Sequence, residues 1–346
     1  MLCIYGAYGY TGELVVETAV AAGLDPVLAG RNEGKLAAVA EANDCEYRAF
    51  AVGETGTHLD GVDALLNCAG PFVETYEPVV SACIEAGVDY LDITGEVEVF
   101  EGIAAHDDAA NEAGVTLLPG VGFDVVPTDC TARHLADRLP EATHLELAFA
   151  GLSSVSRGTA LSALEGMGEG GAVRRDGKLL HRPVGHATRR VAFADRERTV
   201  TAIPWGDLAT AYRTTGIPNV TTYAAIPQAA RLGLRGSRHL PSVGTSLLKP
   251  VLRALVDATV DGPSERRRER GRAEVWGEAR DERTGESVRT RITTPEPYAL
   301  TADSSVAAAR RVLDGETDPG FRTPGGAFGA EFVTELPGVG EFEDLD

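Results

Sequence analysis

The first 122 positions of this sequence alternate between short apolar runs and segments whose apolar residues recur at helical spacing. The run from Leu2 to Tyr5 is apolar without alternation, and the segment that follows residue 12 repeats its apolar residues on one helix face. The strands expected on this basis cover residues 2–5, 26–30, 45–51, 63–71, 89–95 and 115–122, and the helices between them include 33–43, 77–87 and 99–114. Such a pattern is typical of a parallel sheet covered on both faces. Residues 1–122 are therefore predicted to form a doubly wound α/β domain.

After residue 122 the pattern changes to longer strands in which apolar and polar residues alternate. The clearest of these segments are 143–151, 189–194, 219–227, 273–281 and 288–295. Alternation suits a mixed or antiparallel sheet with one face toward solvent, so residues 123–298 are predicted to form a second, α+β domain. A helix is expected over 301–315, and the stretch 316–329 is expected to be a loop.

Three glycines occupy the first turn from strand to helix, in the sequence GAYGYTG. Their G-x-x-G-x-x-G spacing allows a tight turn, backbone amides close to a pyrophosphate, and a helix packed closely on the strand. A tight turn alone already favours glycine, but the first βα turn of such a sheet is also where dinucleotides bind. The residues predicted to contact a dinucleotide here are Gly6, Tyr8, Gly9, Tyr10, Thr11 and Gly12.

The end of the second strand indicates which dinucleotide is bound. An NAD site usually has Asp or Glu about 20 residues after the glycines, where it binds the ribose 2′-hydroxyl. Here the sequence is AGRNEGK, so Arg31 and Asn32 occupy that region and Lys35 follows one helical turn later. A guanidinium binds a 2′-phosphate that a carboxylate would repel. NADPH is therefore the predicted cofactor, and a surface arginine at a helix start is the alternative.

The sequence NCAGPF ends the fourth expected strand, next to the point where the strand order should reverse. Backbone groups of Cys68, Ala69, Gly70 and Pro71 are predicted to contact the ribose or nicotinamide. Cys68 is interpreted as a packed thiol, because no histidine or lysine stands nearby in the sequence to lower its pKa.

The charge balance removes one class of function. The chain has 52 Asp and Glu against 32 Lys and Arg, a formal net charge of −20, and lysine only at positions 35, 178 and 249. An acidic surface repels phosphate backbones, so no nucleic-acid partner is expected. The acidic, lysine-poor composition resembles that of proteins from salt-loving organisms.

The five cysteines contain no C-x-x-C pair, so disulfides are not expected. His181 and His186 have no third residue at a spacing suited to a metal ligand, so a metal site is not expected either. His181 and His186 are interpreted as surface residues. No signal peptide and no membrane-spanning run are recognised, which predicts a cytoplasmic protein.

The motifs GAYGYTG, AGR, NCAGPF, YLDITGE and GVGFDVVPTD occur in this order. Together with GDLATAYRTTGIPNVTTY, GRAEVWGEARD and PYALTADSSVAAARRVL they resemble the saccharopine dehydrogenase-like NADP-binding oxidoreductases, particularly the branch that includes trans-acting enoyl reductases. The resemblance covers most of the chain.

This resemblance implies a Rossmann-type NADP-binding domain over 1–122, a substrate-binding and dimerisation domain over 123–298, and a segment, 299–346, that returns to the first domain. It also implies hydride transfer from NADPH and a homodimer. The lysine and histidine pair of lysine-forming saccharopine dehydrogenases is not recognisable, since Lys178 and Lys249 are the only lysines after position 35.

Several polar residues compete for the proton-transfer role. Glu96 and Asp124 follow the fifth and sixth strands, at the edge where such sheets bind ligands, although a helix-capping role is favoured for both. Tyr223 and Tyr76 are further candidates, with packing as the favoured interpretation. Arg157, Thr159 and Ser162 enter an expected helix and are predicted to contact substrate.

Residues 240–260 repeat apolar positions at helical spacing but are interrupted by Lys249, Pro250, Arg253 and Asp257. Packing in the core or in a dimer is favoured, and peripheral contact with a membrane or lipid is the alternative.

Three functions therefore remain open. The first is an NADPH-dependent reductase of an enoyl or related unsaturated substrate, lipid-derived substrates included. The second is an imine-forming reductase of the saccharopine type. The third is a non-catalytic NADPH-binding or scaffold protein, which the lack of an obvious acid or base keeps open.

Overall fold

The computed structural model describes residues 1–151, 170–183, 185–226 and 264–345. The chain forms two compact units. Unit 1 comprises Met1–Val126 and Tyr298–Phe328, and unit 2 comprises Pro127–Pro297 and Gly329–Asp346. The segment 299–346 is thus divided between the units, because its helix packs in unit 1 and its last residues pair with a strand of unit 2.

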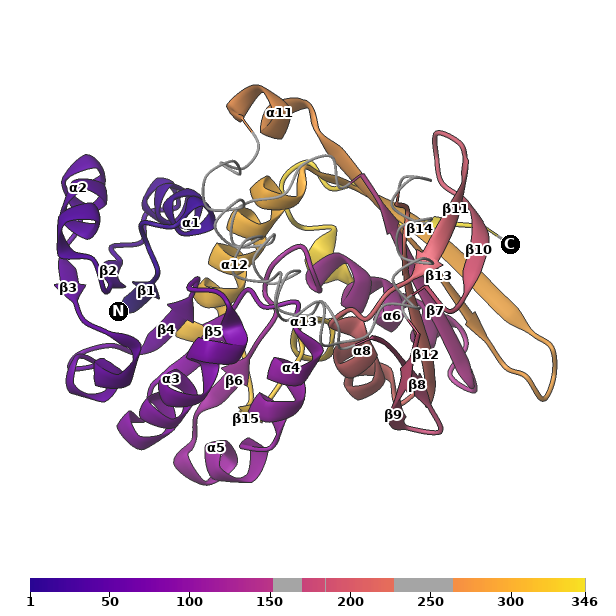
Figure 1. Ribbon diagram of the computed structural model, residues 1–346, viewed down its shortest axis with the longest axis horizontal. Helices are drawn as coiled ribbons and strands as arrows, with labels where there is room; N and C mark the ends of the chain where they lie inside the picture. The colour runs from indigo at the N-terminus through magenta and orange to yellow at the C-terminus, as the bar shows by residue number, and fades with distance from the viewer. Residues whose placement is uncertain (152–169, 184, 227–263, 346) are drawn as a thin grey trace, which may run out of the picture. The chain divides into compact units, whose positions relative to one another are not determined.

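Unit 1 is built on a parallel sheet in the order β15-β6-β5-β4-β1-β2-β3 (Figure 1). The strands are β1 Leu2–Tyr5, β2 Val27–Gly30, β3 Tyr47–Ala49, β4 Ala64–Asn67, β5 Asp89–Asp92, β6 Thr116–Leu118 and β15 Gly320–Phe321. Strands β1, β2, β4 and β6 are buried along their whole length, as expected of a sheet covered on both faces. The predicted doubly wound α/β fold is confirmed.

Helices cover both faces of this sheet. They are α1 Tyr10–Ala21, α2 Glu33–Asn43, α3 Phe72–Ala86, α4 Val97–Ala104, α5 Asp107–Ala113, α12 Pro297–Leu313 and α13 Pro324–Phe328, with a 3-10 turn, η1, at Val52–Thr57. Helix α3 packs beside α4 and α5, as Figure 1 shows, and α1 packs beside α2. The α12 segment contacts α1 through Tyr298, whose ring meets that of Tyr10 edge-on at 5.1 Å between centroids.

Two predictions for unit 1 were wrong in detail. The single helix expected over 99–114 is two helices, because the acidic pair Asp107 and Asp108 starts a new helix after His106, where negative charge is favoured. The expected loop after residue 315 contains strand β15 and helix α13. A two-residue strand has no period to detect, and tertiary contacts hold it: the Phe321 backbone N–H donates to Asp107 Oδ1 at 2.7 Å.

Unit 2 contains a mixed sheet in the order β10-β11-β12-β7-β13-β14-β16, with β8 paired to β12 and β9. Its strands are β7 His144–Ala150, β8 Gly171–Arg175, β9 Lys178–Arg182, β10 Thr188–Ala192, β11 Glu197–Ala202, β12 Asn219–Ala224, β13 Arg272–Arg280, β14 Ser287–Pro295 and β16 Glu343–Asp344. Strands β7 and β12 run parallel, and the other pairs are antiparallel. The prediction of a second domain with a mixed sheet is confirmed.

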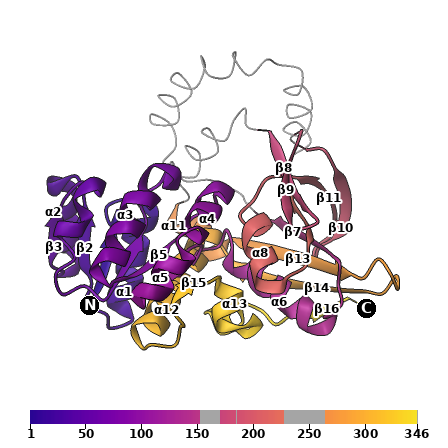
Figure 2. The ribbon, with the colours of Figure 1, turned by 90° about the horizontal axis from the view of Figure 1, so that it is seen from below.

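The two faces of this second sheet differ. One face packs on helices, which are α6 Val126–Arg138 and α8 Asp207–Thr215 (Figure 2). The contact is close, since a Cβ on Gly277 of β13 would meet Leu135 Cδ1 of α6 at 2.6 Å. The opposite face has an apolar cluster at one end, which includes Tyr223 and Trp276, and polar side chains at the other. The described part of unit 2 also contains two short helical segments, α11 Glu265–Arg270 and η2 Ala330–Val333.

Within the described ranges, no helix is both long and apolar enough to span a bilayer.

Candidate functional site

The candidate site of unit 1 lies at the carboxyl ends of its parallel strands. The loops that follow β1, β2, β4, β5 and β6 leave the same edge of the sheet, because the strands run in one direction. Ligands of doubly wound sheets bind at this edge. Each predicted cofactor residue belongs to one of these loops or to the helix that follows it.

The glycine turn after β1 is closed to side chains. Gly6 has a φ of +83°, and a Cβ at this position would meet Ala69 N at 2.9 Å. A Cβ on Gly12 would collide with the Gly6 carbonyl oxygen, so α1 begins directly against the turn. Gly9 is the N-cap of α1 and supplies no side-chain cap. The first turn of α1 therefore presents backbone N–H groups and the positive end of a 12-residue helix to a ligand.

The end of β2 has no carboxylate where a ribose-binding residue is expected. Tyr8 covers this strand end, since a Cβ on Gly30 would meet Tyr8 Cε1 at 2.5 Å. Arg31 is exposed, and among the described residues its guanidinium has no ion-pair or hydrogen-bond partner. Asn32 is the N-cap of α2, and its Oδ1 accepts a hydrogen bond from the Lys35 backbone N–H at 3.0 Å. Sequence reasoning did not identify this capping role.

The loop after β4 is held by a chain of hydrogen bonds. Asn67 Oδ1 accepts from the Ala69 N–H at 3.0 Å, and the Thr75 hydroxyl donates to the Ala69 carbonyl at 2.8 Å. The Gly70–Pro71 peptide bond is cis, and Pro71 is the N-cap of α3. Because Ala69 also contacts the Gly6 turn, the loop and the turn are positioned by the same contact.

Glu96 caps a helix, although not the helix predicted. Its two carboxylate oxygens accept hydrogen bonds from the backbone N–H groups of Phe72 and Val73, at 3.1 and 2.9 Å. These groups open α3, so the Glu96 carboxylate complements that helix N-terminus. Its backbone is the N-cap of α4, where it supplies no side-chain cap.

Asp92, which sequence reasoning missed, lies buried at the end of β5. Its Oδ1 accepts from the Thr94 and Gly120 N–H groups, both at 2.9 Å, and its Oδ2 accepts from the Tyr90 hydroxyl at 2.9 Å. Asn67 Nδ2 donates to the Tyr90 oxygen at 3.4 Å. Burial raises the pKa of Asp92 to about 6, and these hydrogen bonds oppose the increase. The available signal was a carboxylate at the carboxyl end of a parallel strand, directly after the buried Tyr90 and Leu91.

Asp124 lies against the turn between β5 and α4. A Cβ on Gly95 would meet Asp124 Oδ2 at 2.8 Å, so the residue at 95 has to be small. Burial, with a smaller contribution from the Glu96 charge, raises the pKa of Asp124 to about 7. The two candidate carboxylates are therefore close enough to interact, and one of them exchanges a proton near neutral pH.

The remaining candidates lie elsewhere. Tyr76 packs on α4, where a Cβ on Gly102 would contact the Tyr76 ring. Tyr223 belongs to unit 2, and its hydroxyl donates to Glu146 Oε1 at 3.0 Å. Burial raises the pKa of the Cys68 thiol well above its usual value, which disfavours the nucleophilic thiolate. Arg157, Thr159, Ser162 and the segment 240–260 lie outside the described residues.

The turn and the strand end together fit a phosphorylated dinucleotide. Gly6 and Gly12 leave no space for side chains between the ligand and the backbone amides, and Arg31 replaces the usual carboxylate. Among the described residues, no group of three or more His, Cys, Asp or Glu is placed to hold a metal ion.

Comparison with known proteins supports this assignment. Residues 2–118 match the family model of the saccharopine dehydrogenase NADP binding domain. A saccharopine dehydrogenase-like oxidoreductase of Rattus norvegicus is 30% identical over 204 residues, which cover 50% of this chain and 47% of the relative. A Mycobacterium tuberculosis protein, provisionally named a trans-acting enoyl reductase, is 30% identical over 139 residues, or 37% of this chain and 33% of that protein.

A solved structure has the same fold. The apo saccharopine dehydrogenase (L-Glu forming) of Saccharomyces cerevisiae superposes with a TM-score of 0.67 at 13% identity, covering 100% of this chain and 99% of that chain. The matches to the curated relatives span about half of their length or less. The predicted resemblance to saccharopine dehydrogenase-like oxidoreductases is confirmed, and NADP is the cofactor of the matched domain family.

Proposed function

We propose that this chain is an NADPH-dependent oxidoreductase that reduces an enoyl or related unsaturated substrate, lipid-derived substrates included. The observation that carries the proposal is the exposed Arg31 directly after β2, together with a glycine turn after β1 that has no room for side chains at Gly6 and Gly12. The match of residues 2–118 to an NADP-binding domain supports it. The enoyl substrate is suggested by the name of the mycobacterial relative.

Different groups of unit 1 would bind different parts of NADPH. The first-turn amides of α1 would hold the diphosphate, and Arg31 with Lys35 would hold the 2′-phosphate. The Asn67 hydrogen bonds fix the Ala69 backbone, which would contact the nicotinamide side. NADPH, when bound, supplies a hydride to an electron-poor carbon of the substrate.

Asp124 is the proposed proton holder. Reduction of a carbon–carbon double bond needs a proton at the atom next to the one that receives the hydride. Glu96 caps α3 through backbone hydrogen bonds to Phe72 and Val73. Burial raises the pKa of Asp124 to about 7, so this carboxyl group can hold a proton at neutral pH. This assignment goes against the capping role favoured from the sequence.

Cofactor titration tests the binding proposal. Fluorescence titration of the purified chain with NADPH and NADH should give tighter binding of NADPH, and Arg31→Asp should reverse the order. The loss of NADPH affinity should be about tenfold or more, because a charge-assisted contact is replaced by repulsion. Arg31→Lys should keep the preference, and Arg190→Asp, at an exposed position of unit 2, should change neither affinity. Equal affinity for both cofactors in the unaltered chain would contradict the Arg31 assignment.

Substrate assays separate the three candidate functions. Cofactor oxidation with a panel of enoyl thioesters supports the proposed reaction. Oxidation that requires both a ketoacid and an amine supports the imine reductase, and NADPH binding without turnover supports the non-catalytic protein. With the reacting substrate, Asp124→Asn should lower turnover strongly with little effect on NADPH affinity.

A homodimer is part of the proposal, on the family resemblance alone. Sedimentation velocity of the purified chain over a range of concentrations tests it, and a single monomeric species at every concentration would contradict it.

A further inference from the structure

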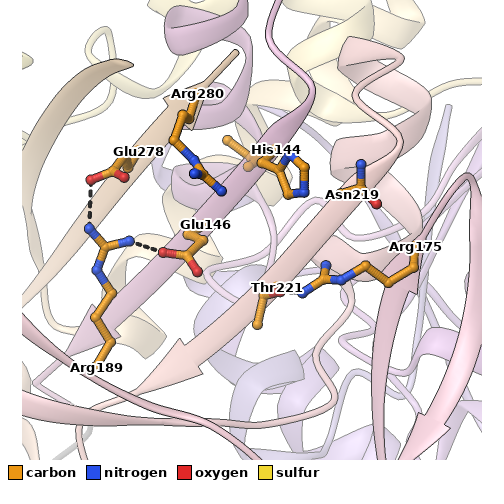
Figure 3. Close-up of a pocket in the computed structure, with 9 residues that line it drawn as sticks. His144, Glu146, Arg175, Arg189, Asn219, Thr221, Glu278 and Arg280 are labelled. Atoms are coloured by element: carbon orange, nitrogen blue, oxygen red, sulfur yellow. Dashed lines mark hydrogen bonds and ion pairs between the residues drawn. The ribbon is translucent and has the colours of Figure 1, made fainter. Parts of the chain in front are cut away.

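The face of the second sheet opposite α6 and α8 contains, at its polar end, a pocket of about 210 Å³. Three neighbouring strands line it in register. His144 of β7 lies between Arg280 of β13 and Asn219 of β12, and Glu146 of β7 lies between Glu278 and Thr221 of the same two strands. Figure 3 shows the guanidinium groups of Arg280 and Arg175 approaching this space from different sides. The pocket belongs wholly to unit 2 and is not used in the proposed reduction.

One arginine in the pocket is fully neutralised. Arg189 forms ion pairs with both Glu146 and Glu278, as Figure 3 shows, and its guanidinium lies 4.6 Å above the centre of the Trp276 ring. Glu278, whose side chain is 10% exposed, also pairs with Arg289. The two carboxylates of the pocket are thus already committed to two arginines.

Two further arginines in the same pocket, Arg175 and Arg280, form no ion pair among the described residues. The charge of the adjacent Asp176 acts on Arg175 but does not outweigh the effect of burial on its pKa. Arg175 donates only to neutral acceptors, the Thr221 hydroxyl at 3.0 Å and the Arg174 carbonyl at 2.9 Å. Arg280 makes no side-chain hydrogen bond or ion pair within the described part of the chain. In a chain with 52 acidic residues against 32 basic ones, it is unexpected that two guanidinium groups in one pocket form no ion pair among the described residues.

The surroundings favour an anion. Burial lowers the pKa of Arg175, so an anion beside it would offset the cost of keeping its charge away from water. Burial also lowers the pKa of His144, and the charges of Arg280 and Arg175 act in the same direction, while Glu282 opposes them. His144 Nδ1 lies 2.9 Å from the Thr143 hydroxyl and Nε2 lies 3.7 Å from the Glu282 carboxylate, so the arginines are the donors considered for an anion. Guanidinium groups bind carboxylates and phosphates through paired hydrogen bonds.

We propose that this pocket binds a small dianion of the phosphate or dicarboxylate class, with Arg175 and Arg280 as its principal ligands. The pocket volume suits an ion of the size of inorganic phosphate or glutarate. The site is independent of the cofactor, so its failure and the failure of the proposed reduction are distinguishable.

Isothermal titration calorimetry of the full chain without NADPH tests the site. Inorganic phosphate and glutarate are the probes, at an ionic strength held constant with sodium chloride because screening weakens exposed charge contacts. The unaltered chain should show saturable binding of at least one probe. Arg280→Gln and Arg175→Gln should each weaken that binding about tenfold or more.

Arg272→Gln is the matched control. Arg272 is an exposed arginine at the other end of β13, and its loss lowers the net charge equally without touching the pocket. Circular dichroism and the melting temperature check folding, and the exposed position of Arg280 keeps that variant informative if Arg175→Gln does not fold.

Three outcomes would overturn the proposal. The first is no saturable binding of either probe by the unaltered chain. The second is an equal loss of affinity in Arg272→Gln, which indicates non-specific charge. The third is a change in the sedimentation coefficient of Arg280→Gln without any change in anion affinity, which indicates an interface between two copies.

Discussion

In the parallel sheet of unit 1 the polar side chains stand where strands end, whereas the mixed sheet of unit 2 carries them along one face. Asn67 and Asp92 are the last residues of β4 and β5, and the residues directly before them are buried because both faces of that sheet are covered. In unit 2, Glu146 and Glu278 lie opposite each other on the adjacent strands β7 and β13, and the described helices α6 and α8 pack on the other face.

The difference explains how each unit satisfies its polar groups. In unit 1 the polar side chains at the strand ends accept hydrogen bonds from backbone N–H groups of loops. Asp92, for example, accepts from the N–H groups of Thr94 and Gly120. The unit 2 network joins side chains to side chains, through Arg189 and Arg289. Loop backbones have few alternative partners when buried, whereas charged side chains at a partly exposed face exchange with water and salt. We therefore expect the largest effects in unit 1.

Gly6→Ala should have the largest effect. The new Cβ meets Ala69 N at 2.9 Å and the backbone has a φ of +83°, so the free energy of unfolding should fall by about 2–3 kcal/mol. Gly23 is the control, because its φ is +79° but nothing lies within 4 Å of a Cβ there. Gly23→Ala should cost about 1 kcal/mol. Urea denaturation measures both, and equal losses would show that the contact with the Ala69 loop contributes nothing.

Asp92→Asn should change the pH dependence of stability. The folded pKa of about 6 exceeds the ordinary carboxyl value, so between pH 4 and pH 6 the native state binds more protons than the unfolded state. The free energy of unfolding should therefore fall as pH rises through this window, by about 2–3 kcal/mol for this group. Asp92→Asn should lack that decrease, and Asp60→Asn, an exposed control, should retain it. Parallel pH profiles for the unaltered chain and Asp92→Asn would contradict this role.

Arg189→Met should cost less, about 1–2 kcal/mol, because Glu278 keeps Arg289 and Glu146 keeps the Tyr223 hydroxyl. Raising the salt concentration should reduce this loss. Arg190 is the next residue on β10, and its side chain is 77% exposed, so Arg190→Met should stay within about 0.5 kcal/mol. Thermal unfolding at low and high sodium chloride measures both variants. A larger loss in Arg190→Met would reverse the interpretation of this face.

Asn32→Asp should have the smallest effect on stability, within about 0.5 kcal/mol, because aspartate can still cap α2. Its charge lies next to Arg31, so NADPH affinity should fall several-fold while NADH affinity should not. Asn32→Ala, which removes the cap, should cost about 1 kcal/mol. A weaker affinity for both cofactors in Asn32→Asp would indicate a local distortion instead of a 2′-phosphate contact.

The sequence was sufficient for features set by local chemistry. Apolar runs and helical periods predicted the strands of the first sheet, and glycine spacing predicted the turn between β1 and α1. It did not predict strand β15, which is too short to have a period, or the partner of Glu96, which lies 23 and 24 residues away. The pocket of unit 2 was also not predicted, because its arginines come from strands β8, β10 and β13.

The sequence by itself determined the two kinds of sheet, the steric closure of the first turn and the absence of an acidic residue at the end of β2. These properties follow from side-chain volume, period and charge within a few neighbouring residues. Only the tertiary structure decided which carboxylates share a site, which of them accept backbone hydrogen bonds and which arginines form no ion pair among the described residues. Hydrogen bonding and desolvation depend on distances between distant parts of the chain, and those distances are set when the sheets form.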